Sequence, residues 1–422
     1  MIHLSLIREQ PDKIRKGAKN KGEVIDLDSL LNLDNEHRSL LNSLNELREK
    51  RNRVSEEIGK TKGTGKGALD SIQAMKKVSQ QIKELEEKVG ILAEQLNSKL
   101  LRIPNLPHDS VPIGKNVEDN VIIREWGDEH QFDFAPKSHL ELGASLNLFD
   151  FERGAKISGS GFPLYMGKGA KLERSLINFM VDMHVDTYGF TEVFPPFVVR
   201  REAMVTTGQL PKFEEDMYHT EVDDLFLIPT AEVPVTGIHG NEILEEEDLP
   251  IKYVAYSACF RREAGSYGKD THGFLRLHQF NKVELVKYVT PGSSYDELES
   301  LTAQAESVLQ ALGLRYRVVE LCTADLSFAS AKCFDLEVWA PGEKKWLEVS
   351  SCSNFEGFQA RRGNIRYRRE DNRKVECVHT LNGSGVATPR LLVALLETYQ
   401  REDGTVEIPE ALQPHLGIKE LA

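Results

Sequence analysis

Hydrophobic residues recur at alternating spacings of three and four in two stretches within the first quarter of the chain. The first stretch covers residues 40–58, with Arg51 in one of its apolar slots, and the second covers residues 75–96 without a break. The glycine-rich segment 59–67 separates them and is expected to interrupt any helix. This pattern predicts an antiparallel coiled-coil hairpin with its tip at about 59–67.

Beyond residue 104 the pattern changes to short alternating runs that are typical of β-strands. Strands are expected near 225–229, 253–263, 274–289, 315–320, 333–339 and 345–350. Helices are expected at 170–188, 294–312 and 390–399. Gly189 is expected to close the first of these helices as a left-handed cap. We therefore predict an α+β fold with a largely antiparallel sheet at 105–422, preceded by a helical arm at 1–104.

The composition of the 422 residues, 40% hydrophobic and 28% charged, is that of a soluble globular protein. No apolar run reaches the roughly 18 residues that a membrane span needs. The first 21 residues mix charges among their apolar positions, unlike a signal peptide. The five cysteines form no Cys-x-x-Cys pair, which favours reduced thiols over disulfides or a zinc cluster. We expect a cytoplasmic protein with no membrane partner and no zinc.

The net charge of -13 is unevenly distributed along the chain. Residues 1–103 hold 20 Lys and Arg against 16 Asp and Glu, so the acidic excess lies in the remainder. The basic residues around the predicted tip are Arg48, Lys50, Arg51, Arg53, Lys60, Lys62 and Lys66. A rigid, locally basic finger suits contact with a phosphate backbone. A dimerisation or spacer role is the alternative for such a hairpin.

The most informative chemistry lies in the two predicted strands around a glycine-rich loop. Arg261 and Glu263 are two residues apart, so on a strand they would share one face, as would Phe280, Lys282 and Glu284. A cation, carboxylates and an aromatic ring on one surface can together hold a phosphate, a purine and an ammonium group. A surface hairpin with cross-strand ion pairs is the alternative.

Two polar segments elsewhere add candidate ligands. Thr230 and Glu232 follow an apolar strand, where the alternative is an ordinary helix start capped by Thr230. Glu348 lies between Leu347 and Val349 in a predicted strand, and a buried carboxylate there would need a partner or a cation.

A third segment leads from Ser384 into an almost wholly apolar helix. Thr388 suits the N-cap and Pro389 the first helical position, which would place Arg390 in the first turn. An arginine at the mouth of a buried helix needs an anion, and an ATP phosphate is a good candidate. No Rossmann fingerprint or Walker loop occurs in the chain, so a nucleotide would have to be held in another way.

Together these segments resemble class II aminoacyl-tRNA synthetases, and within that class the bacterial-type seryl-tRNA synthetase family. The resemblance covers essentially the full chain. The segments that carry it are motif 1 at 189–197, the seryl-branch segment 230–232, motif 2 at 260–263 with 278–280, the seryl-branch segment 348–351, and motif 3 at 383–390.

The resemblance implies that L-serine and ATP react to give seryl-adenylate, from which the seryl group passes to the 3′ end of serine tRNA. It implies ATP and Mg²⁺ at the site, and a homodimer with Pro196 in its interface. It also implies that the arm contacts the long variable arm of serine tRNA, and it leaves selenocysteine tRNA open as a second substrate.

The same resemblance implies the following site residues. Serine would be bound by Thr230, Ala231, Glu232, Arg261, Glu284 and Ser384. ATP would be bound by Arg261, Arg262, Glu263, Arg276, Leu277, Phe280, Glu348, Val349, Ser350, Ser351 and Arg390. Arg261 would bridge the α-phosphate and the serine carboxylate, while Phe280 would stack on adenine.

Mg²⁺ would be held by Glu348 and Ser351, because it prefers oxygen ligands. Strand alternation puts these two side chains on opposite faces, so the strand must twist or bulge after Val349 if both reach the ion. The chain departs from many relatives in carrying Arg262 in motif 2 and the Thr-Pro pair before Arg390.

Two other functions stay open from the sequence. A synthetase-like ligase could load an amino acid onto a carrier protein, although such an enzyme would have no use for a basic arm. A coiled-coil scaffold with a decayed catalytic domain is the non-enzymatic alternative, and the intact charged residues of the motifs argue against it.

Overall fold

The computed structural model describes residues 1–60, 66–263 and 273–422, without the side chains of 57–60 and 66–72. The chain divides into two compact units. One comprises Ile2–Lys19 and Glu23–Pro104, and the other comprises Met1, Asn20–Gly22 and Asn105–Ala422. Within the described residues no helix has the length and apolar character that crossing a membrane requires.

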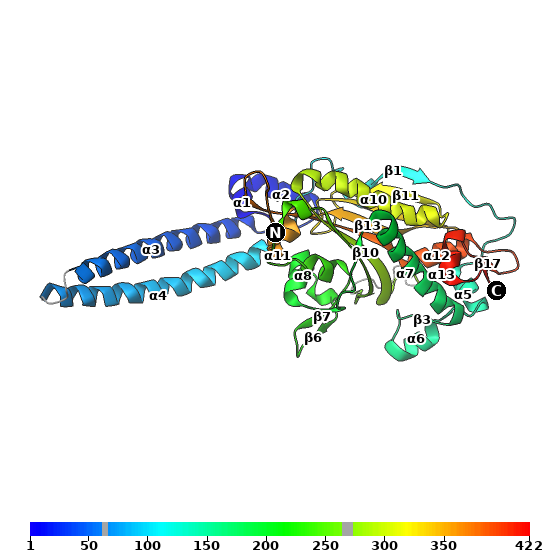
Figure 1. The fold of residues 1–422 in the computed structure, drawn as a ribbon, viewed down its shortest axis with the longest axis horizontal. Coiled ribbons are helices and arrows are strands. Elements are labelled where there is room, and N and C mark those ends of the chain that lie inside the picture. The colour runs from blue at the N-terminus through cyan, green and yellow to red at the C-terminus, as the bar shows by residue number, and fades with distance from the viewer. Residues whose placement is uncertain (61–65, 264–272) are drawn as a thin grey trace. The chain divides into compact units, whose positions relative to one another are not determined.

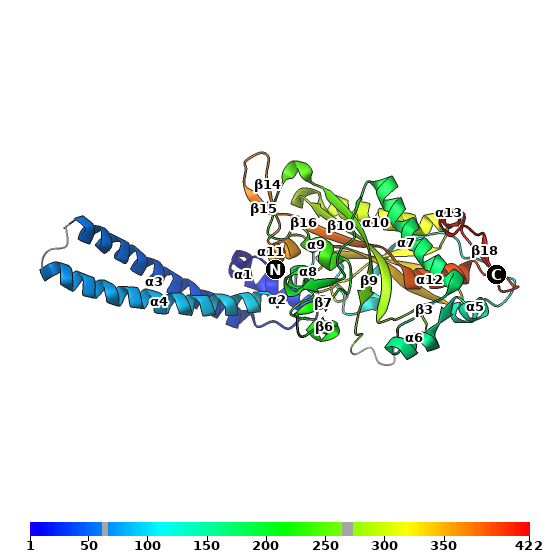
Figure 2. The same ribbon diagram turned by 60° about the horizontal axis from the view of Figure 1, so that its bottom comes forward.

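The smaller unit is built on two long helices. Its helices are α1 (Leu4–Glu9), α2 (Pro11–Asn20), α3 (Leu27–Lys60) and α4 (Lys66–Leu100). Helices α3 and α4 lie side by side (Figure 2). Leu44, Val78 and Ile82 are buried between them, which matches the predicted spacing. The predicted two-helix arm is therefore confirmed.

The tip of the arm differs from the prediction in its extent. Helix α3 continues through Gly59 to Lys60, and α4 begins at Lys66. Residues 59, 60, 66 and 67, which were expected in the tip, are therefore helical, and 61–65 lie outside the described residues. Lys62, one of the predicted basic contacts, lies outside the described residues.

The larger unit is organised around an eight-stranded sheet with the order β1-β11-β12-β13-β16-β10-β9-β4. Its strands are β1 (Val121–Trp126), β4 (Thr191–Glu192), β9 (Ile251–Phe260), β10 (Gln279–Val289), β11 (Tyr316–Glu320), β12 (Lys332–Ala340), β13 (Lys345–Asn354) and β16 (His379–Ala387). Neighbouring strands pair antiparallel, except that β4 is parallel to β9. The predicted antiparallel α+β architecture is confirmed.

Shorter elements surround this sheet. The additional strands are β2 (Phe149–Asp150), β3 (Leu164–Tyr165), β5 (Val198–Arg200), β6 (His219–Thr220), β7 (Leu225–Leu227), β8 (Ile243–Glu245), β14 (Arg366–Arg368), β15 (Val375–Cys377), β17 (Val406–Glu407) and β18 (Glu420–Leu421). The helices are α5 (His139–Ser145), α6 (Phe151–Ser158), α7 (Gly167–Tyr188), α8 (Arg201–Thr207), α9 (Glu232–Gly237), α10 (Ser294–Ala311), α11 (Phe358–Gly363), α12 (Thr388–Thr398) and α13 (Gln413–Leu416).

One face of the sheet is covered by α7, α10 and α12, which pack on its central strands (Figure 1). Strand alternation separates this apolar face from the opposite one. In β10, Val283 and Leu285 enter the core under the helices, whereas the side chains of Phe280 and Lys282 line a cavity. The sheet therefore presents a row of polar side chains opposite its helical layer.

Helix ends follow the expected chemistry at one position and differ at another. Gly189 ends α7 with φ 65°, and its N–H donates to the carbonyls of His184 and Val185, so the predicted left-handed cap is confirmed. The N-cap of α12 is Ala387 and not Thr388, as had been expected. The Thr388 hydroxyl contacts Glu173 and the Asn281 carbonyl, because α12 starts one residue earlier. Arg390 still lies in the first turn.

The strands that flank the 264–272 segment are shorter than the pattern predicted. Strand β9 ends at Phe260, and β10 begins at Gln279. Arg261 and Glu263 therefore do not alternate on a strand, and Glu263 has the left-handed φ of 51°. The expectation that strand geometry puts this pair on one face was wrong, because the chain leaves the sheet before Arg261.

Candidate active site

Segments that are far apart in the sequence meet around a cavity of about 1010 Å³ in the larger unit. The predicted serine- and ATP-binding residues that line it are Thr230, Glu232, Arg261, Glu263, Arg276, Leu277, Phe280, Glu348, Val349, Ser351, Ser384 and Arg390. The predicted residues outside its lining are Ala231, Arg262, Glu284 and Ser350. The sheet thus brings most of the expected side chains to one place.

A fully buried carboxylate, Glu284 of β10, forms one end of the site. The Thr230 hydroxyl donates to Glu284 Oε2 at 2.6 Å, and Lys282 Nζ lies 2.5 Å from the same oxygen. Asn382 Nδ2 donates to Oε1 at 3.3 Å. These partners compensate a charge that would be costly to bury alone. Lys282 and Asn382 line the cavity and contact Glu284, so the Glu284 side chain lies directly behind the cavity wall.

Lys282 was missed as a site residue, although its alternation with Phe280 and Glu284 was the available signal. Its ammonium also donates to the Thr230 hydroxyl at 2.9 Å. Thr230 Oγ1 further accepts the Glu232 backbone N–H at 3.2 Å, which stabilises the start of α9. The N-cap of α9 is nevertheless Ala231 and not Thr230, so the interpretation of Thr230 as an ordinary helix cap was wrong by one residue.

A second carboxyl group, Glu232, closes the same end of the cavity. Burial, followed by the charge of the neighbouring Glu284, raises the pKa of Glu232 to about 7. Glu232 Oε1 accepts a hydrogen bond from Gln359 Nε2 at 2.7 Å. Gln359 in turn accepts from the Thr380 hydroxyl at 2.7 Å. The site thus contains two acidic groups that a bound ammonium ion would favour in ionised form.

Arg261 lies between this acidic end and the aromatic part of the cavity. Its Nε donates to the Pro229 carbonyl at 3.3 Å, next to Thr230. Its guanidinium carbon is 5.1 Å from the centre of the Phe280 ring. A cation in this position is suited to joining two anionic groups.

Two ion pairs line the far part of the cavity. Arg276 Nη1 is 2.7 Å from Glu263 Oε2, and Arg390 Nη1 is 3.5 Å from Glu348 Oε2. Arg390 also donates to the Glu348 carbonyl at 2.9 Å. Partly exposed pairs of this kind contribute about 0–1 kcal/mol, so incoming phosphates can replace the carboxylates at small cost.

Arg262 does not join these arginines. Its Nη1 donates to the Glu215 carbonyl at 2.9 Å, and its backbone N–H donates to the Asp216 carbonyl. The side chain is therefore directed to the 215–216 segment and does not line the cavity.

The strand that carries Glu348, β13, contains a bulge where a twist or bulge had been expected. Leu336 pairs with Ser350 and Glu337 pairs with Glu348, so Val349 is the extra residue of a β-bulge. Glu348 and Ser351 consequently both line the cavity. The expectation of a buried Glu348 was wrong, since its side chain is 49% exposed at the cavity wall.

Ser350 and Asp335 complete this region. The Ser350 hydroxyl is buried and donates to the Ser384 carbonyl at 2.6 Å, which ties β13 to β16. Asp335 pairs with Ser351 across the strands and lines the cavity, and it was missed by the sequence analysis. Burial, followed by the charge of Glu348, raises the pKa of Asp335. The two carboxylates, Asp335 and Glu348, repel each other when both are charged. Together with the Ser351 hydroxyl they offer the oxygen ligands that a hard divalent cation such as Mg²⁺ prefers.

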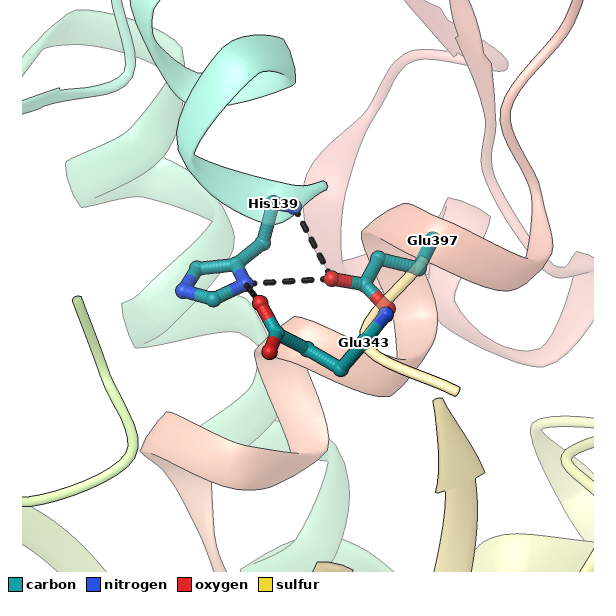
Figure 3. A group of neighbouring side chains, drawn as sticks. All are labelled: His139, Glu343 and Glu397. Atoms are coloured by element: carbon teal, nitrogen blue, oxygen red, sulfur yellow. Dashed lines mark hydrogen bonds and ion pairs between the residues drawn. The ribbon is translucent and has the colours of Figure 1, made fainter. Parts of the chain in front are cut away.

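A separate group of His139, Glu343 and Glu397 is shown in Figure 3. Glu397 Oε1 accepts the His139 backbone N–H at 2.9 Å and lies 3.0 Å from His139 Nδ1. Its Oε2 accepts the backbone N–H groups of Gly342 and Glu343 at 2.9 and 3.0 Å. Both carboxylate oxygens are therefore engaged by N–H donors, and the group fastens α5 and the β12–β13 turn to the end of α12.

Comparison with known proteins gives the family of the chain. The model of the seryl-tRNA synthetase N-terminal domain matches residues 1–107, and that of the tRNA synthetase class II core domain (G, H, P, S and T) matches residues 212–399. The serine–tRNA ligase of Geobacillus kaustophilus is 53% identical over 422 residues, covering 100% of both chains. The chain belongs to the seryl-tRNA synthetase family.

Solved structures of this family agree with that assignment. The crystal structure of seryl-tRNA synthetase from Pyrococcus horikoshii complexed with ATP has a TM-score of 0.93 and 41% identity, covering 100% of this chain and 99% of that one. Cytoplasmic serine–tRNA ligase from Naegleria fowleri in complex with AMP has a TM-score of 0.86 and 30% identity, with 100% and 98% covered. The resemblance inferred from the motifs and the predicted class II fold are confirmed.

Glu232 makes the stability of the larger unit depend on pH. Its folded pKa of about 7 exceeds the ordinary value of 4.5, so its contribution is fully present below pH 4.5 and is lost as pH rises through 7. We expect Glu232→Gln to stabilise the chain relative to wild type above pH 7, by on the order of 3 kcal/mol, with little difference at pH 4.5. Urea unfolding followed by tryptophan fluorescence measures this, since Trp126, Trp339 and Trp346 all lie in the larger unit.

The exposed Glu402→Gln variant is the matched control and should show no such pH-dependent difference. An offset between Glu232→Gln and wild type that is equal at both pH values would contradict the raised pKa.

Proposed function

We propose that this chain is a serine–tRNA ligase, which activates L-serine with ATP and transfers the seryl group to the 3′ end of serine tRNA. The buried Lys282–Glu284–Thr230 group beside Arg261 carries the proposal, because it offers an ammonium-binding carboxylate next to a carboxylate-binding arginine. The similarity to a synthetase solved with ATP supports the nucleotide part of the assignment.

Serine recognition follows from the polarity of the pocket. The Glu284 carboxylate and the Thr230 hydroxyl would accept hydrogen bonds from the serine ammonium and hydroxyl. Ser384 and Glu232 would complete the wall, and Ala231 would shape the turn. Free alanine bound in place of serine lacks the hydroxyl and would leave a buried polar group of the pocket without its partner, at a cost of about 1–3 kcal/mol. Polar recognition of this kind discriminates better than pocket size alone.

The activation step needs two anions to approach each other. Arg261 would contact both the serine carboxylate and the α-phosphate, so that the carboxylate oxygen can attack phosphorus in line with the departing pyrophosphate. Arg276 would release Glu263, and Arg390 would release Glu348. Both arginines would then bind the outer phosphates of ATP. Phe280 would stack on adenine.

We further propose that Glu348 and Ser351 hold Mg²⁺, with Asp335 beside them, and that the ion neutralises phosphate charge when bound. Glu263, Leu277 and Val349 would contact the nucleotide from the cavity wall. Arg262 and Ser350 are left out of this proposal because their side chains are bonded elsewhere.

The two parts of the chain would divide the work. Residues 105–422 would carry the chemistry, and residues 1–104 would bind the long variable arm of serine tRNA. Lys50 and Arg53 are exposed on α3, whereas Arg48 is also ion-paired with Glu86 of α4 at 2.7 Å. The exposed basic side chains support electrostatic contact with a phosphate backbone. Selenocysteine tRNA is a second candidate substrate that the same charging assay tests.

A homodimer is also part of the proposal. Pro196 is exposed, and near it Phe194 is 73% and Val198 43% exposed. A cluster of exposed apolar residues around the motif 1 strand is consistent with an interface there. Sedimentation of the purified chain tests the oligomeric state.

Replacing Glu284 should abolish serine activation. We expect Glu284→Ala to lower kcat/KM for serine in ATP–pyrophosphate exchange by roughly 100-fold or more, since the ammonium loses a charged partner. Glu284→Gln keeps the shape and should also be impaired. ATP binding, measured separately by titration, should survive in both variants.

The control is Glu320→Ala, which removes a carboxylate paired with Lys332 at 3.0 Å in the same sheet but outside the cavity lining. It should retain exchange kinetics close to wild type. Unchanged serine kinetics in both Glu284 variants would remove Glu284 from the site.

Removing the end of the arm should separate the two half-reactions. We expect deletion of residues 48–69 to leave serine-dependent pyrophosphate exchange intact and to abolish charging of full-length serine tRNA. The double variant Lys50→Glu, Arg53→Glu should raise KM for tRNA by about tenfold or more at low salt, because phosphate contacts are lost.

Its matched control reverses two exposed acidic residues of the same helix, Glu46→Lys and Glu49→Lys, and should not weaken charging. Normal charging by the deletion variant would refute the role proposed for the arm.

A further inference from the structure

A buried carboxyl group on the opposite side of the sheet contacts two of the segments that build the cavity. Glu173 of α7 is only 5% exposed. Its Oε1 accepts a hydrogen bond from Asn281 Nδ2 at 2.7 Å and another from the Thr388 hydroxyl. Helix α7, strand β10 and the start of α12 are therefore joined at one oxygen atom.

The strand partner of Glu173 lies directly behind the aromatic part of the cavity. Asn281 follows Phe280 and precedes Lys282, and both of these neighbours line the cavity. Strand alternation turns Asn281 to the other face, where the Tyr256 hydroxyl also donates to its Oδ1 at 3.1 Å. Fixing Asn281 therefore fixes the backbone that presents the Phe280 ring.

The helix partner of Glu173 is Thr388, which lies with Arg390 in the first turn of α12. Thr388 is two residues before Arg390, and its hydroxyl also lies 3.1 Å from the Asn281 carbonyl. Arg390 itself is held by the carbonyls of Leu275 and Glu348 at 3.3 and 2.9 Å. The bond from Glu173 to Thr388 thus sets where the first turn of α12 stands relative to β10.

A carboxyl group is an expensive choice for this location. Glu173 lies in a layer dominated by apolar side chains, among them Leu172 and Leu176 of the same helix. Burial raises the pKa of Glu173 to about 7 despite the hydrogen bonds from Thr388 and Asn281, which lower it. Its Oε2 has no hydrogen-bond partner among the described residues. An apolar side chain of similar volume would avoid this desolvation, so packing alone does not account for the carboxyl group.

We propose that Glu173 is a positioning residue for ATP: by bonding Asn281 and Thr388 together, it fixes the separation between the Phe280 ring and the Arg390 guanidinium. The inference rests on the proposed function and assigns a role to a side chain outside the cavity. Loss of the two bonds lets β10 and α12 shift relative to each other. The nucleotide then loses simultaneous contact with the aromatic ring and the arginine, whereas the serine pocket around Glu284 keeps its own hydrogen bonds.

The test compares Michaelis constants in ATP–pyrophosphate exchange. Glu173→Met keeps the volume and removes both acceptors, and it should raise KM for ATP roughly tenfold, as expected for the loss of about one hydrogen bond's free energy. KM for serine should stay within about twofold of wild type. Glu173→Gln retains an acceptor oxygen and should restore KM for ATP to near the wild-type value.

Two further variants keep the test decisive. Thr388→Val removes the hydroxyl with little change of shape and should also raise KM for ATP, which covers the case in which Glu173→Met does not fold. Glu306→Met removes another buried glutamate, one that bonds Arg124 and Tyr316 away from the cavity, and should leave both Michaelis constants unchanged.

An unchanged KM for ATP in both Glu173→Met and Thr388→Val would overturn the inference. So would a fall in kcat alone that follows the folded fraction. An equal rise of KM for ATP in Glu173→Gln and Glu173→Met would also contradict it. Failure of the proposed function is distinguishable, because the wild-type chain itself would then show no serine-dependent exchange.

Discussion

The burial of Glu284 is the constraint on which the rest of the site depends. A carboxylate without access to water needs charged or hydrogen-bonding partners, and here they come from the 229–232 turn, from β10 itself and from β16. In the sheet β10 is paired with β16, and this pairing brings Asn382 next to Glu284. The polar contacts of the pocket thus depend on the order in which the strands pair.

The two faces of the sheet explain how a polar cavity and a stable core coexist. Alternate side chains along each central strand pack under α7, α10 and α12. The side chains between them point to the opposite face, where they are available for ligands. A β-bulge at Val349 breaks this alternation and brings Glu348 and Ser351 to the same cavity. Arg261 lies between the acidic end around Glu284 and the Phe280 ring, so the cavity joins an acidic part to an aromatic part.

Features that depend on neighbouring positions in the sequence were accessible without a structure. The spacing of Leu44, Val78 and Ile82 predicted the helical arm, and Gly189 predicted a helix end. Most of the site residues that the motifs predicted do line the cavity. A twist or bulge after Val349 also followed from strand alternation, once the resemblance had assigned both Glu348 and Ser351 to one ion. Local periodicity and turn chemistry are enough for such features.

Features that depend on distant partners were missed or misjudged. Lys282 was visible in the pattern, but its role became clear only from its contacts with Glu284 and Thr230. Asp335 enters the cavity because β12 pairs with β13, a register that one strand's sequence does not specify. Glu348 was expected to be buried because its neighbours are apolar, yet it faces the open cavity. Arg262 was assigned to ATP by motif position, but its bonds direct it to the 215–216 segment.

The central claim is that these separated groups surround one bound reaction intermediate. A crystal structure of the chain with a non-hydrolysable sulfamoyl analogue of seryl-adenylate tests it most directly. The expected result is an amino group at Glu284 and Thr230, a sulfamoyl group at Arg261, and an adenine ring on Phe280. An analogue bound away from this cavity, or bound with its amino group remote from Glu284, would contradict the claim.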